Sequence, residues 1–402
     1  MDVPRRGMRV GAAVLVVGFT GAGVGAGEAT AANDVVYPPG TLEPALSRLA
    51  SLDRAALRQV IVSPMDSGAT AAQVRVSGAE GRWLGTSGVA DLRTGAPVPA
   101  DGRFRIGALT QTFIATVVLQ LAAERRIDLE RPVQHYLPGL LPLSLGPVTV
   151  RQLLDHTHGL PPVPHAVRSA SWFFEHRFRR WSPRELVALA VSGAPRFVPG
   201  TRQEEGDIGA LVAGLLIEKV TGRPYGQAVR ERILAPLHLR DTSVPGHDPT
   251  VPGPHARGYE SVAERDGATR QVDVTEANPS WAWAAGEMIS STADLDTFLV
   301  TLFRGGLLPP EQLEDLFRVP DVPHVSGGRA VHSAGLTRVD LDGLSLWGRS
   351  GAFPGSTSGM VATRDARRRL VFSLNTLRMD EARPALADRV LRAVFAPRAS
   401  QT

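Results

Sequence analysis

The order of hydrophobic periodicities along the chain restricts its possible folds more than any other feature of the sequence. Alternation typical of strands occurs near both ends, at residues 72–76, 81–89, 344–347, 357–363 and 370–375. Between these ends the apolar residues recur mainly at helical spacing. This order predicts an α/β (α+β) fold, with an antiparallel sheet built from both chain ends, flanked by helices and interrupted by a mostly helical region.

Helix signals divide the chain further. Ser182-Pro183-Arg184-Glu185 predicts a helix start, because a Ser cap is followed by Pro in the first position and Glu three residues after the cap. Apolar spacing predicts helices at residues 45–60, 112–127, 150–155, 208–221, 292–303 and about 382–395. We place a leader at 33–45 and one domain at 46–396, with a sheet part at about 46–107 and 285–396 and a helical part at about 108–284.

Composition excludes several classes of function. The 402 residues include no cysteine, so disulfides, thiolate metal sites and cysteine nucleophiles are absent. The net charge is only +4, from 44 basic and 40 acidic residues, and no basic block indicates a nucleic-acid partner. The only lysine is Lys219. We expect no cofactor and no metal, and the sequence leaves the oligomeric state open.

The N-terminus resembles an export signal. Arg5, Arg6 and Arg9 precede an uncharged stretch, Val10–Gly27, and small residues at 29–31 suit a cleavage site near Ala31 or Ala32. The sequence therefore predicts a signal peptide at 1–32 and a secreted or cell-surface protein. An uncleaved membrane anchor is the alternative, because the uncharged stretch is close to the length of a membrane span.

Several segments together resemble one enzyme superfamily. They are Phe104-Arg105-Ile106-Gly107-Ala108-Leu109-Thr110-Gln111-Thr112-Phe113, then residues 150–157, 213–222 and 285–292, and Trp347-Gly348-Arg349-Ser350-Gly351. In this order the chain is similar to the serine β-lactamase and penicillin-binding-protein superfamily, in particular to the class C β-lactamases and secreted actinomycete D-alanyl-D-alanine carboxypeptidases. The resemblance covers about residues 40–396 and implies the fold and the ancestry of a serine hydrolase.

The catalytic residues of that superfamily are replaced in this chain. The family requires Ser-x-x-Lys, in which Ser attacks a carbonyl and Lys accepts its proton, but these positions are Ala108 and Gln111. Its Tyr-x-Asn element corresponds to Glu205-Gly206-Asp207, and its His-x-Gly element to Arg349-Ser350-Gly351, of which only the glycine remains. Since Lys219 lies in another predicted helix, no displaced Ser-x-x-Lys exists.

A hydrolase without nucleophile and base retains roughly 10³–10⁴-fold rate enhancement over water after losing about 10⁶. We therefore predict a pseudoenzyme that does not form an acyl-enzyme. The alternatives are an enzyme with altered chemistry that uses Glu205, Asp207 or Arg349, in which a cleft carboxyl acts as acid or base, and a hydrolase with a relocated nucleophile. Candidates for that nucleophile are Ser350, Ser356 and Ser358.

The replacements predict specific contacts. An unpaired buried charge costs roughly 3–5 kcal/mol, so we expect Arg349 to contact Glu205 or Asp207, and Gln111 to hydrogen-bond to Asp207. Drift into an exposed surface is the alternative. The resemblance also implies an oxyanion hole formed by the backbone N–H groups of Ala108 and Ala352, which side-chain changes do not remove. The cleft is thus expected to hold a cell-wall peptide or another peptide-like ligand; the candidate ligand-binding residues are Ala108, Gln111, Glu205, Asp207, Arg349, Ser350, Gly351 and Ala352.

Two further motifs have simpler interpretations. Asp155-His156-Thr157-His158 resembles a metal cluster, but no second ligand motif accompanies it, so we do not assign a metal. Trp172, Phe173 and Phe174 could cover the cleft, although packing within the helical region is favoured.

Overall fold

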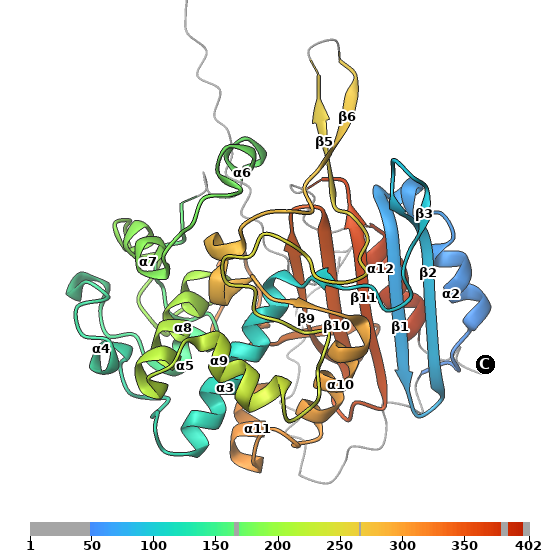
Figure 1. Cartoon of the computed structure of the whole chain (residues 1–402). Helices are drawn as coiled ribbons and strands as arrows, with labels where there is room; N and C mark the ends of the chain where they lie inside the picture. The colour runs from blue at the N-terminus through green and yellow to red at the C-terminus, as the bar shows by residue number, and fades with distance from the viewer. Residues whose placement is uncertain (1–48, 165–168, 265–266, 379–384, 397–402) are drawn as a thin grey trace, which may run out of the picture.

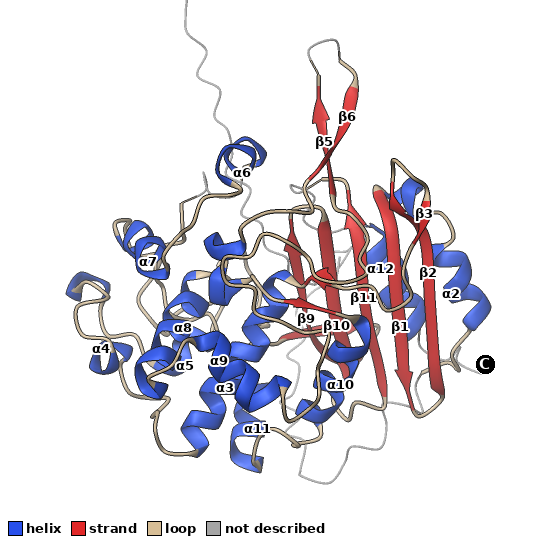
Figure 2. Cartoon of the chain, viewed as in Figure 1, coloured by secondary structure: helices blue, strands red, loops and turns tan. Residues whose placement is uncertain are grey.

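The computed structural model describes residues 49–164, 169–264, 267–378 and 385–396. Its centre is a seven-stranded antiparallel sheet in the order β3-β2-β1-β11-β10-β9-β8 (Figures 1 and 2). The strands are β1 (Ala69–Gly78), β2 (Gly81–Asp91), β3 (Ala96–Pro97), β8 (Thr337–Leu341), β9 (Leu344–Phe353), β10 (Ser356–Thr363) and β11 (Arg368–Thr376). Because β1 pairs with β11, both chain ends build one sheet, and the predicted fold class is confirmed.

One face of the sheet is covered by the first and last helices described. These are α2 (Arg54–Ile61) and α12 (Ala385–Phe395), which lie side by side at the right of Figure 1. Register places Val74 opposite Phe372 and Val76 opposite Leu370, so alternate residues of both strands bury their side chains beneath these helices. This apolar layer holds the two ends of the chain together.

The opposite face packs against the helical region. At its centre lie α3 (Thr110–Ala123) and α8 (Ile208–Thr221), which are apolar on nearly every side and therefore buried. The other helices are α4 (Val133–Tyr136), α5 (Val150–Leu154), α6 (Ala170–His176), α7 (Pro183–Val191), α9 (Tyr225–Val229), α10 (Thr292–Phe303) and α11 (Pro310–Phe317). Two small sheets pair β4 (Phe104–Arg105) with β7 (Ile289–Ser290), and β5 (Tyr259–Ala263) with β6 (Thr269–Asp273).

Several predicted boundaries were wrong. Of the helix expected at 45–60, residues 45–48 lie outside the described residues, and the described part begins at Arg54, because the Asp53 carboxylate caps it by accepting hydrogen bonds from the N–H groups of Ala55 and Ala56. The helix expected at 112–127 begins at Thr110 and ends at Ala123, followed by Arg125 in a left-handed conformation with φ 58°. The sequence patterns also missed β8 and the β5–β6 hairpin.

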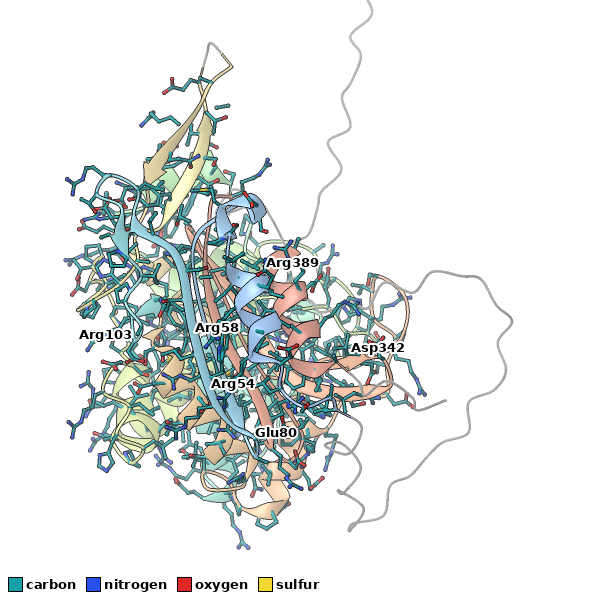
Figure 3. All side chains as sticks on the ribbon, turned by 90° about the vertical axis from the view of Figure 1, so that its right-hand side faces the viewer. Arg54, Arg58, Glu80, Arg103, Asp342 and Arg389 are labelled. Carbon is teal, nitrogen blue, oxygen red and sulfur yellow. The ribbon has the colours of Figure 1, made fainter. Side chains whose placement is uncertain are left out.

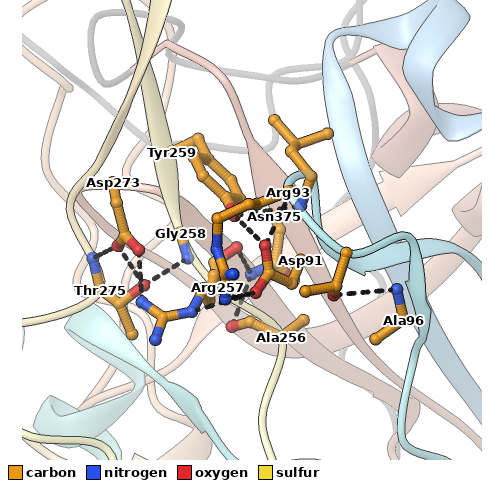
Figure 4. A network of polar contacts seen from close by, with 12 residues as sticks. Asp91, Arg93, Ala96, Ala256, Arg257, Gly258, Tyr259, Asp273, Thr275 and Asn375 are labelled. Carbon is orange, nitrogen blue, oxygen red and sulfur yellow. Dashed lines mark hydrogen bonds and ion pairs between the residues drawn. The ribbon is translucent and has the colours of Figure 1, made fainter.

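The β5–β6 hairpin, which projects above the sheet in Figure 1, is anchored by a polar network (Figure 4). Arg257 forms an ion pair with Asp273, and its Nε lies 3.7 Å from Asp91 Oδ2. The Tyr259 hydroxyl donates to Asp91 Oδ1 at 3.2 Å. These contacts tie the base of the hairpin to the end of β2.

The predicted signal peptide, the whole predicted leader and the start of the predicted last helix lie outside the described residues, so export stays a prediction. Within the described ranges, no helix is long and apolar enough to span a bilayer.

Candidate functional site

The start of α3 is pressed against β9 by backbone contacts that only glycine allows. A Cβ at Gly351 would lie 2.1 Å from the Ile106 carbonyl oxygen and 2.7 Å from the Ala108 nitrogen. Gly107 has φ 52°, and a Cβ there would lie 2.6 Å from the Ala352 nitrogen. The short 3-10 helix Gly107–Leu109, which carries Ala108, is therefore held directly beside Gly351 and Ala352.

Two of the candidate serines hold the segment before that 3-10 helix in place. Ser356 Oγ donates to the Arg105 carbonyl at 3.2 Å, and Ser358 Oγ donates to the Ile106 carbonyl at 3.1 Å. Both serines are buried. Each hydroxyl donates its hydrogen bond to a carbonyl oxygen, which is too weak a base to activate the serine as a nucleophile. The structure therefore gives Ser356 and Ser358 a structural explanation. Ser350 is also largely buried, at 8% exposure.

The three replaced motifs meet at Arg349. The Arg349 side chain is the largest fully buried side chain of the described residues, at 1% exposure. Arg349 Nη2 lies 2.7 Å from Glu205 Oε1 and donates to Gln111 Oε1 at 2.6 Å. The predicted ion pair between Arg349 and Glu205 is confirmed, and the contact between Arg349 and Gln111 was not foreseen.

Gln111 links the other side of this cluster. Its Nε2 donates to Asp207 Oδ1 at 3.5 Å, a long hydrogen bond, and to the Ala285 carbonyl at 3.3 Å. The predicted contact with Asp207 is thus present. Asp207 directly precedes α8, while Glu205 lies two residues earlier, so both carboxylates approach from the same loop. The side chains of Glu205, Asp207 and Ala108 are partly exposed, whereas Gln111 and Arg349 are buried.

Two buried histidines complete the cluster, and the sequence did not indicate their role. His156 Nε2 lies 3.5 Å from Arg349 Nη1, and His156 Nδ1 lies 3.4 Å from the Gly206 N–H. His332 Nε2 lies 3.9 Å from Glu205 Oε2, and its ring meets that of His156 edge-on at 5.2 Å. Burial, followed by the charge of Arg349, holds the pKa of each of these histidines well below its ordinary value. Both imidazoles are therefore neutral at neutral pH.

A neutral imidazole offers one acceptor nitrogen, so His156 cannot accept from both Arg349 and Gly206 at once. Arg349 Nε also has no hydrogen-bond partner in the described structure. The positive charge of Arg349 is thus balanced by Glu205, but its hydrogen-bonding capacity is only partly used.

The loop that carries Glu205 is fixed by Gln203. This buried amide donates to the carbonyls of Asp155 and His332 at 2.7 and 2.8 Å, and accepts from the N–H groups of Val331 and His332. All its hydrogen-bonding capacity is satisfied. Gln203 therefore positions both Glu205 and His332 beside Arg349. An isolated Gln between two charged residues gives no periodic signal, so the role of Gln203 could not be predicted from the sequence.

His158 and the aromatic side chains of α6 are explained by packing and hydrogen bonding. His158 is buried, its Nδ1 accepts from the Leu160 N–H at 2.9 Å, and burial lowers its pKa to about 4. No group of three or more His, Asp or Glu side chains in the described ranges is arranged to hold a metal ion. Phe173 is buried against Val274 and against Phe353 at the end of β9, and Trp172 stacks on His176 at 4.8 Å, so these side chains pack as expected but against a sheet strand as well as within the helical region.

This arrangement restricts the chemistry of the cleft. Ala108 has no hydroxyl, Gln111 cannot accept a proton, and the cation at Arg349 cannot act as a base. Of the residues at these positions, Ala108 and Asp207 are partly exposed and Ala352 is exposed, whereas Glu205 Oε1 pairs with Arg349 and Glu205 Oε2 is buried. Neither Ala108 nor Gln111 can therefore supply the nucleophile or base that the family's chemistry requires at these two positions.

Comparison with known proteins identifies relatives over most of the chain. A model of the beta-lactamase family matches residues 57–395. A D-stereospecific amidohydrolase from Streptomyces sp. is 36% identical, with a TM-score of 0.74, and the match covers 86% of this chain and 99% of that structure. A D-amino acid amidase from Ochrobactrum anthropi SV3, solved with L-phenylalanine, is 28% identical with a TM-score of 0.72, over 85% and 97% of the two chains.

Curated relatives match over shorter regions. Esterase EstB of Burkholderia gladioli is 29% identical over 201 residues, which cover 45% of this chain and 48% of the esterase. Penicillin-binding protein 4* of Bacillus subtilis is 22% identical over 306 residues, covering 72% and 64% of the two proteins. The matches therefore span less than two thirds of the length of these curated relatives.

Proposed function

Because the chain belongs to the beta-lactamase family, we propose that it is a non-acylating member of this hydrolase family that binds a small peptide or amino-acid amide without cleaving it. One observation carries the proposal. The three positions that should supply nucleophile, base and strand residue hold Ala108, Gln111 and Arg349, and Arg349 contacts both Gln111 and Glu205.

The ligand class follows from what the cleft retains. The backbone at Ala108 is held beside Gly351 and Ala352, as an oxyanion hole of this family requires, and backbone N–H groups bind a carbonyl or carboxylate oxygen whatever the side chains are. The charge of Glu205 is balanced by Arg349, so it is the partly exposed carboxylate of Asp207 that suits a ligand with a free ammonium group. The similar protein from Ochrobactrum anthropi SV3 is a D-amino acid amidase, and amino-acid amides combine a carbonyl with a free ammonium group.

Calorimetry on the purified chain tests this proposal, with D-phenylalanine amide and a peptide ending in D-alanyl-D-alanine as probes. The expected result is saturable binding, with no product by chromatography after prolonged incubation. Absence of heat with both probes would overturn the proposed binding. Appearance of free amino acid would overturn the loss of catalysis.

A pair of variants separates binding from altered chemistry. Asp207→Asn removes a partly exposed carboxylate without breaking the Arg349–Glu205 pair, whereas Glu204→Gln removes a neighbouring carboxylate that is held by two hydrogen bonds of 2.8 Å from Arg196. We expect Asp207→Asn to weaken affinity about tenfold, the equivalent of 1.4 kcal/mol, and Glu204→Gln to leave it unchanged. Turnover that only Asp207→Asn abolishes would instead support a carboxylate-based enzyme.

A further inference from the structure

The sheet has one edge that is largely uncovered. Strand β3 pairs only with Val89 and Asp91 of β2, so residues 81–88 of β2 have no strand beside them on that side within the described residues. A two-residue turn joins β1 to β2, so the Gly78–Gly81 pair that closes it is a hydrogen-bonded pair. The backbone N–H and C=O groups of Gly81 and of every second residue after it therefore form hydrogen bonds with β1. The backbone groups of Arg82, Leu84 and Thr86 therefore point toward the open side.

This open edge lacks the usual devices that prevent strand pairing. Residues 81–88 contain no proline and a single charged residue, Arg82. Exposed apolar side chains lie on both faces near the edge: Leu84, on the face opposite α2, is 38% exposed, and Val62 and Met65, which follow α2, are 59% and 49% exposed. These are three of the seven large apolar side chains that the described structure exposes. An open edge flanked in this way is suited to pairing with another strand.

Charges along the edge are arranged for a second copy in reverse orientation. Helix α2 follows β2 in the same direction: Arg54 Nη2 lies 3.7 Å from the Cβ position of Gly81, and Pro64 approaches the Cβ position of Gly88. Arg54 and Arg58 thus flank one end of the edge and Asp66 the other. Figure 3 shows Arg54 and Arg58 on α2, on the face turned toward the viewer. Among the described residues, none of these three side chains forms an ion pair.

We propose that the open edge of β2 is a dimerisation surface, on which a second copy of this chain adds its own β2 in antiparallel orientation. A two-fold axis across β2 places Arg54 and Arg58 of each copy toward Asp66 of the other, so opposite charges face each other at both ends. It also joins the two sheets into one and shields Leu84, Val62 and Met65 from water. This inference concerns a surface far from the cleft and does not depend on the proposed function.

Proline at an outward-pointing residue tests the surface without breaking the hairpin. Leu84→Pro removes an N–H that faces the open side, whereas the bonds between β1 and β2 remain. Asp340→Pro is the control at the opposite edge of the sheet, because Asp340 also occupies an outward position, on β8, one residue before the Leu341–Leu344 turn pair. Sedimentation of the full chain over a concentration series measures the dimer. We expect Leu84→Pro to raise the dissociation constant at least about tenfold and Asp340→Pro to leave it unchanged.

A second variant guards against a folding defect. Thr86→Lys keeps every backbone group and places a lysine on the edge, so it is also expected to weaken the dimer. Because the chain has no cysteine, single cysteines at Arg82, Leu84 and Thr86 report the contact directly. We expect at least one of them to form a disulfide-linked dimer on oxidation, and Asp340→Cys to form none. A chain that stays monomeric at high concentration, or a dimer that survives both Leu84→Pro and Thr86→Lys, would overturn the proposal.

Discussion

Two networks of arginine and carboxylate groups lie in very different surroundings. Beneath the β5–β6 hairpin, Arg257 pairs with Asp273 while its side chain remains 42% exposed (Figure 4). In the cleft, Arg349 pairs with Glu205 at 1% exposure and is bordered by His156 and His332 rather than by water. The same chemical pair therefore has a solvated form and a desolvated form in one molecule.

The difference in burial shows which of the two networks can be explained by its contribution to the stability of the fold. The pKa of Asp273 is lowered despite the opposing effect of burial, because Thr275 and Arg257 donate to its carboxylate. In the cleft, Arg349 Nε and His332 Nε2 have no hydrogen-bond partner in the described structure. A buried ion pair is often no more stabilising than well-packed apolar side chains. The cleft network is thus a feature of the site, whereas the network beneath the hairpin is a feature of the fold.

The largest expected effect comes from breaking the buried pair. Glu205→Ala leaves the Arg349 charge buried without its carboxylate, and should lower the free energy of unfolding by about 3–5 kcal/mol. The double variant Glu205→Ala/Arg349→Met should recover most of that loss, because no charge is then left unpaired. Urea unfolding monitored by circular dichroism measures both. A single variant within 1 kcal/mol of wild type would contradict the contrast.

A pH effect of slightly smaller size arises near the same site. His158 titrates at about 4 in the folded chain because burial lowers its pKa, against an ordinary value of 6.5. Below pH 6.5 the unfolded chain binds a proton that the folded chain does not, so stability falls as the pH decreases toward 4, by about 3 kcal/mol in total. Comparing wild type with His158→Gln in urea at pH 7, 5.5 and 4.5 isolates this contribution. Parallel pH profiles for the two proteins would refute it.

The smallest effect is expected at the hairpin. Arg257→Gln should change the free energy of unfolding by less than about 1 kcal/mol, and the difference should shrink in high salt, which screens exposed charges. Thermal unfolding at low and high salt measures it. A larger loss in the free energy of unfolding that does not depend on salt would show that the Arg257 pair is not a weak, solvated ion pair.

The sequence predicted the architecture because strand and helix periodicities are local and the two ends carry complementary strand patterns. It also predicted that Arg349 contacts Glu205 or Asp207 and that Gln111 hydrogen-bonds to Asp207, because the family resemblance brings these positions together and a buried charge needs a partner. It did not predict His156 and His332 beside Arg349, nor the clamp formed by Gln203. These residues come from loops, whose path depends on tertiary packing rather than on any repeating pattern.

We propose that this chain does not form an acyl-enzyme, and intact-mass measurement after incubation with a fluorescent penicillin tests this proposal most directly. A family member that retains Ser-x-x-Lys serves as the positive control. We expect an unchanged mass and no fluorescent band for this chain, because Ala108 offers no nucleophile and Gln111 no base. A covalent adduct, mapped by peptide mass to any residue of this chain, would contradict the proposal and identify the nucleophile.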